Sequence, residues 1–303
     1  MRRFLSLGVL LALIGCSSAP DKPSPTPLKR ITEIVEIDDV ESTSLGDGDQ
    51  TGLSPAVDGD SIAAASAGGD VYLFDAKLDE LWNTDIDRTI LGGVALNSTA
   101  VYVATSDATL VALSRKKGEV LFEVTLPGNS IVPAVATDTM VFVKTQIGQL
   151  IALNAVSGET VWFEEAKESN VGIRGGAPIS LSDDVLFVLW ESGRIMAYQA
   201  QTGRILWERQ VAVSRGRSPL DRIVDSKGAP SVRNGFIATA TRNGQVSLLS
   251  ARDGQLIWSF DSDAYPGALL AFNAVTVVET DGTISAFSAQ SGESLWSTGA
   301  LKH

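Results

Sequence analysis

One pattern recurs six times along the chain and always ends on a large aromatic residue. The closing aromatics are Trp82, Phe122, Trp162, Trp207, Trp258 and Trp296. Successive ones are separated by 40, 40, 45, 51 and 38 residues. Repeats of about 40–50 residues match one four-stranded blade of a β-propeller. Because each repeat must bury its apolar faces against its neighbours, this periodicity restricts the fold more than any other feature of the sequence.

Small residues recur at fixed places within the repeats. In five copies a glycine lies four residues before the aromatic: Gly118, Gly158, Gly203, Gly254 and Gly292. In four copies an alanine lies ten residues before it: Ala112, Ala152, Ala197 and Ala286. The strand that carries the alanine, such as 150–153, is apolar on both faces, which indicates cover on both sides.

We therefore predict an all-β fold, a β-propeller of four-stranded antiparallel blades with six repeats visible. The closing aromatics are expected to fill the gaps between blades as core residues, not to form a cofactor cage. Each indole N–H is expected to find a backbone carbonyl of a neighbouring blade.

The N-terminus predicts a lipid anchor. Residues 1–15 join two arginines to an apolar run that is shorter than the roughly 20 residues needed to span a bilayer, as in a secretory signal peptide. Leu13–Cys16 is similar to the bacterial lipobox, in which the cysteine is acylated, and Cys16 is the only cysteine of the chain. Ser17 follows it where an aspartate would resemble an inner-membrane retention signal, so analogy with lipoproteins of this kind implies the periplasmic face of the outer membrane. Four prolines make 16–30 an extended tether, and 31–303 is expected to be the propeller domain.

Composition excludes several function classes. The chain has one Cys and one His, and that His is the last residue, so a Cys/His zinc cluster, a Ser-His-Asp triad and a disulfide framework are excluded by count. The formal net charge of −12 argues against a general nucleic-acid binder. No metal or cofactor is expected.

Two further stretches and the repeats together carry a resemblance to a known family. The chain resembles the BamB family of outer-membrane assembly lipoproteins, which are quinoprotein-like propellers. The resemblance lies in the six repeats, the lipobox, residues 171–178 (VGIRGGAP) and residues 220–225 (LDRIVD). The resemblance runs from about Leu28 to Trp296. It implies a non-enzymatic scaffold that docks the barrel-inserting subunit BamA through its POTRA domains and assists insertion of β-barrel proteins.

The chain departs from that family in two ways. Family members usually have eight blades, whereas six repeats are visible here. Either six blades close the ring, with a strand over 31–37 completing one sheet, or two blades are missing. In the second stretch Lys227 stands where the family has an acidic residue.

The spacing of the repeats places a candidate partner site. The two longest intervals are consecutive, so two adjacent connectors, before Pro178 and before Pro230, are expected to form one patch on one face of the ring. The segment from Arg204 to Arg233 contains seven basic and three acidic residues, which gives it a local charge of +4. The candidate residues are Val171 and Ile173 as apolar anchors, Arg174 as a charged donor, and Asp221, Arg222 and Asp225 as polar partners. Alternatively, Arg174 is solvated or pairs internally with Asp225.

Other functions remain open from the residues alone. A quinone-dependent dehydrogenase would need calcium and a channel carboxylate, for which Asp184 or Glu191 are available. A glycan or peptidoglycan binder would need an aromatic platform, for which only Trp190 is left outside the repeat. An exposed blade edge could also pair with a strand of an unfolded β-barrel client.

Overall fold

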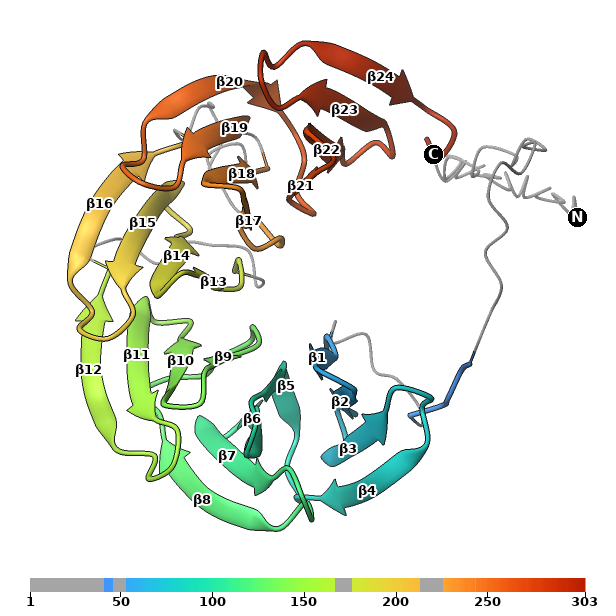
Figure 1. The fold of residues 1–303 in the computed structure, drawn as a ribbon, viewed down its shortest axis with the longest axis vertical. Helices are drawn as coiled ribbons and strands as arrows, with labels where there is room; N and C mark the ends of the chain where they lie inside the picture. The colour runs from blue at the N-terminus through green and yellow to red at the C-terminus, as the bar shows by residue number, and fades with distance from the viewer. Residues whose placement is uncertain (1–40, 46–52, 167–175, 213–225, 243, 303) are drawn as a thin grey trace, which may run out of the picture.

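The computed structural model describes residues 41–45, 53–166, 176–212, 226–242 and 244–302. In these residues it forms twenty-four strands in six four-stranded antiparallel sheets, each built from consecutive strands (Figure 1). The predicted all-β fold of four-stranded blades is confirmed. Within the same residues, no helix is long and apolar enough to cross a membrane.

The first three blades take their strands in chain order. Blade 1 contains β1 (Ala56–Asp58), β2 (Ser61–Ala65), β3 (Asp70–Asp75) and β4 (Glu80–Asp85). Blade 2 contains β5 (Ile90–Leu96), β6 (Ala100–Thr105), β7 (Thr109–Ser114) and β8 (Val120–Thr125). Blade 3 contains β9 (Val135–Ala136), β10 (Met140–Lys144), β11 (Gln149–Asn154) and β12 (Thr160–Glu165).

The last three blades repeat this plan. Blade 4 contains β13 (Ser180–Ser182), β14 (Val185–Leu189), β15 (Arg194–Gln199) and β16 (Ile205–Gln210). Blade 5 contains β17 (Ser231–Arg233), β18 (Phe236–Ala240), β19 (Gly244–Ser250) and β20 (Leu256–Ser262). Blade 6 contains β21 (Ala268–Ala271), β22 (Ala274–Val278), β23 (Ile284–Ser288) and β24 (Ser294–Thr298).

Burial follows the position of a strand in its blade. The second and third strands of the central blades, such as β10 and β11, are buried along most of their length, while the outer strand β12 alternates between exposed and partly buried residues. A strand that is covered on both faces needs apolar residues on both faces, and the outer strand, with one wet face, does not. The apolar runs of the sequence therefore mark the middle strands.

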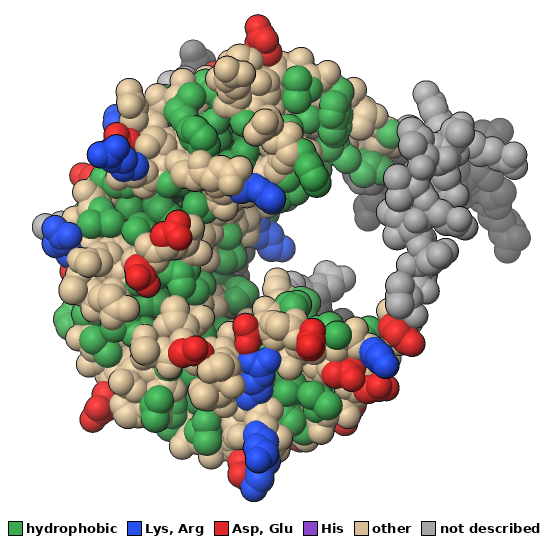
Figure 2. Space-filling view, in the orientation of Figure 1, with side chains coloured by type: hydrophobic (Ala, Val, Ile, Leu, Met, Phe, Trp, Pro, Cys, Tyr) green, Lys and Arg blue, Asp and Glu red, His purple; other side chains and the backbone are tan. Residues whose placement is uncertain are grey.

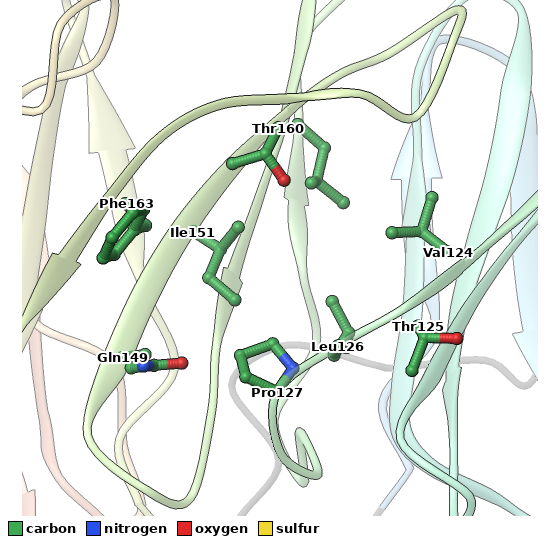
Figure 3. A pocket seen from close by; sticks show the side chains of 9 residues that line it. Val124, Thr125, Leu126, Pro127, Gln149, Ile151, Thr160 and Phe163 are labelled. Carbon is green, nitrogen blue, oxygen red and sulfur yellow. The ribbon is translucent and has the colours of Figure 1, made fainter.

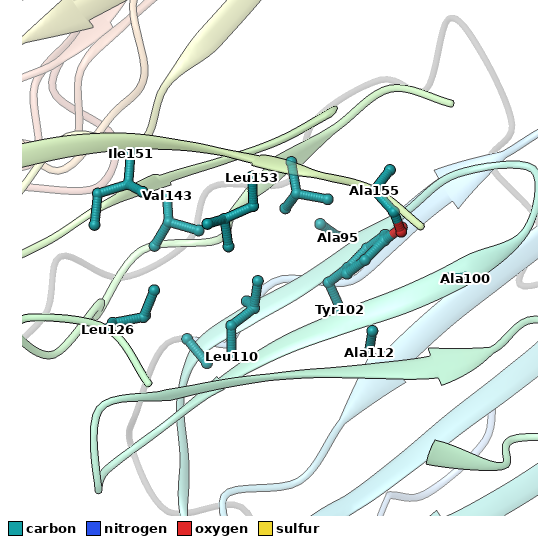
Figure 4. Close-up of a cluster of buried hydrophobic side chains, with 12 residues drawn as sticks. Ala95, Ala100, Tyr102, Leu110, Ala112, Leu126, Val143, Ile151, Leu153 and Ala155 are labelled. Atoms are coloured by element: carbon teal, nitrogen blue, oxygen red, sulfur yellow. The ribbon is translucent and has the colours of Figure 1, made fainter. Parts of the chain in front are cut away.

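The core lies between the sheets, not inside any one of them. Five clusters of buried apolar residues occupy the five junctions between successive blades. Figure 4 shows the cluster between blades 2 and 3, where Leu110 and Leu126 face Val143 and Leu153. Each blade is thus stabilised mainly by its neighbours, as expected of a repeat architecture.

The six blades form an open arc. In Figures 1 and 2 the described residues of blades 1 and 6 lie at its two ends, separated by an opening. Among the described residues, the six blades therefore do not close a ring. The strand suggested over 31–37 lies outside the described residues, and all six blades have four strands without it.

Four closing tryptophans link successive blades as predicted. Each indole donates its N–H to a carbonyl of the following blade: Trp82 to Arg115 at 2.8 Å, Trp162 to Ala200 at 2.9 Å, Trp207 to Ala251 at 3.1 Å and Trp258 to Ala289 at 3.0 Å. Phe122 has no such donor. At that junction the buried Tyr102 hydroxyl donates to the Ala155 carbonyl at 2.9 Å.

For Trp296 the prediction of a buried gap-filling aromatic is wrong, because this side chain is 50% exposed. No described blade follows β24 to cover it.

Candidate functional site

The candidate site is built on the two long connectors. One joins β12 to β13 and the other joins β16 to β17. The predicted partner-binding residues Val171, Ile173, Arg174, Asp221, Arg222 and Asp225 lie outside the described residues, as does Cys16. The structure does describe both ends of each connector, and these ends locate the site on the ring.

The described ends of both connectors lie on the same face of the arc. Each begins at the end of an outer strand and reaches the start of the next inner strand. Ser180, the first residue of β13 after the first connector, donates its hydroxyl to the carbonyl of Pro230, the last residue of the second connector, at 2.5 Å. The ends of the two connectors are therefore neighbours, as the repeat spacing predicts, while a continuous patch between them stays a prediction.

A single turn of blade 4 holds the start of the second connector. The Gly193 carbonyl accepts the backbone N–H groups of Val211 at 2.9 Å and Ala212 at 3.1 Å. A Cβ at Gly193, where φ is +76°, would lie 2.4 Å from the Ala212 oxygen, so only glycine fits this contact. The Gln210 side chain adds a bond to the Ser192 carbonyl at 2.8 Å.

The same turn holds the end of the first connector through a buried ammonium group. Lys144, with a side chain 3% exposed, donates to the Ala177 carbonyl at 3.2 Å, the Leu189 carbonyl at 3.0 Å and Glu191 Oε1 at 2.9 Å. Its Nζ also lies 5.2 Å from the centre of the Trp190 ring. Residues 189–193 of blade 4 therefore bind the described start of the second connector directly and the described end of the first connector through Lys144.

Sequence reasoning missed Lys144, although a signal was present. In the five other blades the equivalent position is apolar: Ala65, Ala104, Leu189, Ala240 and Val278. A lysine at this position breaks the apolar pattern of the repeat. It indicates a hydrogen-bonding or charged partner nearby, because a buried charge is costly when it is unpaired.

The end of the second connector rests on the junction with blade 6. The Lys227 N–H donates to the Tyr265 carbonyl at 2.9 Å, and the Lys227 residue is exposed. A Cβ at Gly228 would lie 2.3 Å from the Pro266 oxygen, so the two backbones are in close contact. The second connector is thus fixed at both ends to different blades.

The basic residues of 204–233 do not all gather on this face. Arg204 immediately precedes the outer strand β16 and Arg233 ends the inner strand β17, so both lie at the opposite ends of these strands from the connectors. Lys227 lies on the connector itself. Sequence separation alone could not distinguish the two faces, because a blade runs back and forth between them.

The residues on which the alternative functions depend have structural roles. Glu191 is engaged by Lys144, and Asp184 lies in the exposed turn between β13 and β14. Trp190 is 2% exposed and donates to the Tyr198 hydroxyl at 3.2 Å, so its use as a glycan platform is wrong. Across the described ranges, no three His, Cys, Asp or Glu side chains come together as a cation site.

A small apolar pocket of about 230 Å³ lies between blades 2 and 3. Figure 3 shows Leu126, Pro127 and Ile151 along its wall, with Phe163 at one side. Phe163 is 61% exposed. No part of the sequence pattern predicts this pocket, because residues from two different blades line it.

Three comparisons relate the chain to known proteins. The family model described as "Outer membrane protein assembly factor BamB" matches residues 67–298. The protein of that name from Pseudomonas aeruginosa is 32% identical over 301 residues, covering 97% of this chain and 79% of the relative. The crystal structure of BamB from Moraxella catarrhalis is 27% identical, with a TM-score of 0.77 over 84% of this chain and 77% of that one.

A more distant likeness concerns the fold alone. A quinohemoprotein alcohol dehydrogenase from Pseudomonas putida is 12% identical, with a TM-score of 0.58, over 71% of this chain and 42% of that chain.

Proposed function

The chain belongs to the family of outer membrane protein assembly factor BamB, and from this premise we propose that it is a non-enzymatic scaffold lipoprotein that assists assembly of β-barrel proteins at the outer membrane. The family match over residues 67–298 carries the proposal. In this role the protein docks the barrel-inserting subunit, BamA, through its POTRA domains. Acylated Cys16 holds the propeller at the periplasmic face of the membrane.

The mechanism is positional. An acyl anchor confines the propeller to the membrane surface, and the tether over 16–30 lets it reach a partner nearby. Confinement raises the effective concentration of the docking face without any chemical step. No nucleophile or acid–base pair is required of the chain, and its one Cys is used by the anchor in this proposal.

The docking face consists of the two long connectors of blades 3 to 5. We assign Val171 and Ile173 as apolar anchors and Arg174 as the charged donor, because arginine combines a planar fork of donors with an apolar stem. Asp221, Arg222 and Asp225 supply polar contacts on the second connector. Support comes from the ends of the connectors, which the Ser180–Pro230 hydrogen bond brings together.

A site-specific crosslink tests this assignment. A photoreactive residue at Ile173, in cells that carry the whole assembly machine, is expected to capture the barrel-inserting subunit. The control is the same residue at Val156, which is 77% exposed and lies in the turn at the opposite end of blade 3. Capture of that subunit from Val156 and not from Ile173 would contradict the proposed face.

A charge reversal then measures the contact. We expect Arg174→Glu to weaken binding to the purified POTRA domains at least about 30-fold, the loss typical of an interface hot spot. Lys116→Glu makes the same charge change in the exposed turn between β7 and β8, on the other face of the ring. It is expected to leave the affinity unchanged. Full affinity of a folded Arg174→Glu protein would remove Arg174 from the interface.

A further inference from the structure

Lys144 is the one charged residue among six equivalent positions of the blades, five of which, its own included, are buried. The residues at this place in the other five blades are alanine, leucine or valine. A repeat protein could keep an apolar residue here and avoid desolvating an ammonium group. The exception lies at the junction of blades 3 and 4, where the first long connector returns to the ring.

The acceptors of the ammonium group come from separate parts of the chain. Leu189 and Glu191 belong to the end of β14 and the turn after it, and Ala177 belongs to the connector. All three N–H bonds of the ammonium therefore have a described acceptor. Such a group fixes direction as well as distance, which an apolar contact at the same place would not do.

The backbone next to Ala177 approaches the ion pair very closely. At Gly176, where φ is +45°, a Cβ would lie 2.8 Å from Glu191 Oε1. The path of the connector at this point is thus fixed by a glycine, by the Lys144–Ala177 bond and by the turn of blade 4. On its other side the same turn binds Val211 and Ala212, the start of the second connector.

We propose that Lys144, with Glu191, is a positioning residue for the docking face: it fixes the place where the first long connector rejoins the ring, next to the second connector. This inference rests on the proposed function. Binding sites lose affinity when their supporting residues leave them loose, because ordering must then occur on binding. Lys144 itself does not need to touch the partner.

The test uses Lys144→Met in the full chain, with affinity for the purified POTRA domains, thermal unfolding, and amide hydrogen exchange of residues 166–179 as readouts. We expect affinity to fall about tenfold or more, and exchange at the end of the connector to become faster. Val188→Ala, which removes buried apolar atoms from the same junction, is the control for lost stability. It is expected to keep its affinity.

A second variant separates positioning from stability. Lys144→Met/Glu191→Leu removes both charges, so it is expected to recover thermal stability relative to Lys144→Met, because no partly buried carboxylate is left without its ammonium partner. Its affinity is expected to stay low, because the Ala177 carbonyl still has no ammonium donor. Recovery of affinity together with stability, or equal affinities of Lys144→Met and Val188→Ala, would overturn the inference.

The exchange measurement keeps the two proposals distinguishable. If the unsubstituted chain does not bind the POTRA domains, the proposed function fails, while faster exchange in Lys144→Met would still support the positioning role. Unchanged exchange of residues 166–179 would overturn that role whatever the binding result.

Discussion

Trp162 and Trp296 occupy the same place in their sheets but lie in different surroundings. Each pairs with the central alanine of the third strand, Ala152 or Ala286. Trp162 is covered by the turn of blade 4 and donates its N–H there, whereas Trp296 is 50% exposed. The burial of a closing aromatic is therefore a property of the next blade and not of its own.

Blade 1, at the other end of the arc, lacks a feature that receives the aromatic ring of a preceding blade. In five blades a glycine with positive φ lies under the preceding aromatic ring, and a Cβ there would approach ring atoms to between 2.5 and 3.0 Å. The corresponding residue in blade 1 is Leu78, with a φ of +62°. A side chain at this position would meet an incoming ring, since even a Cβ would do so in the other five blades. Blade 1 is thus not built to receive the closing aromatic of another blade in this way.

The largest predicted difference compares two tryptophan deletions. We expect Trp207→Ala to lower the free energy of unfolding by about 3–5 kcal/mol, because it leaves a cavity between blades 4 and 5. Trp296→Ala is expected to cost less than about 1 kcal/mol, since half of this side chain is already exposed. Urea unfolding of both variants measures the difference. Equal losses would mean that a blade, and not its neighbour, sets the contribution of the aromatic.

The glycine beneath the ring gives the next prediction. Gly203→Ala places a methyl group 2.7 Å from the Trp162 ring at a φ of +72°, and we expect a loss of roughly 2–4 kcal/mol from strain and overpacking together. Gly235 has a similar φ of +76°, and a methyl group there would have no atom within 4 Å. Gly235→Ala therefore isolates the backbone cost, about 1–2 kcal/mol. If the two losses are equal, the ring contact contributes nothing.

These two comparisons also indicate how far the sequence could predict the structure. The aromatic spacing and the glycines predicted the blades, their order and the indole hydrogen bonds, because those features depend on residues that repeat. Exposure of Trp296 was missed because it depends on which blade follows. Leu78 carried a signal for the open arc, since it replaces the glycine that the other five repeats share.

The candidate site was predictable to a smaller extent. Connector length alone placed two loops side by side, and the Ser180–Pro230 bond agrees with that placement. Arg204 and Arg233 lie on one face and Lys227 lies on the other, and a count of charges along the sequence could not predict this. Lys144 was missed because its role depends on acceptors 33 to 47 residues away in the chain.

The junction between blades 2 and 3 tests whether the hydrogen bond or the ring is essential. Tyr102 replaces the missing indole donor of Phe122, and burial raises the pKa of the Tyr102 hydroxyl, which favours its protonated, donating form. We expect Tyr102→Phe to cost about 1–3 kcal/mol, because the Ala155 carbonyl and the Asn97 side chain lose a partner. Tyr72→Phe, at a partly exposed tyrosine of blade 1, is the control and is expected to cost less.

A rescue sharpens this prediction. In the Tyr102→Phe background, Phe122→Trp would supply an indole N–H at the place where the four other junctions have one. We expect it to recover part of the lost stability in urea unfolding. A further loss in the double variant would show that the junction is adapted to the smaller ring.

The smallest expected effect concerns the turn of blade 6 between β22 and β23. Its backbone repeats the arrangement of blade 4: a Cβ at Gly282 would lie 2.3 Å from the Leu301 oxygen, as one at Gly193 would lie 2.4 Å from the Ala212 oxygen. Here Asp281 also accepts from the Thr283 backbone at 2.8 Å and pairs with Lys302 at 2.9 Å. The Thr283 hydrogen bonds and then Lys302 lower the pKa of Asp281 from 3.8 to about 2.

A carboxyl whose pKa is lowered by folding stabilises the fold above its unfolded pKa, and this contribution is lost as pH falls through the folded value. Asp281 therefore stabilises blade 6 above about pH 4, and the contribution declines between about pH 4 and pH 2. Carboxyl NMR titration is expected to show Lys302→Met raising the pKa of Asp281 only part of the way to 3.8, because the larger Thr283 contribution remains. Asp253, whose pKa is lowered chiefly by the Ser250 side chain in blade 5, is expected not to move. An Asp281 pKa that returns fully to its ordinary value in Lys302→Met would mean that Lys302, and not the Thr283 hydrogen bonds of the turn, lowers this pKa.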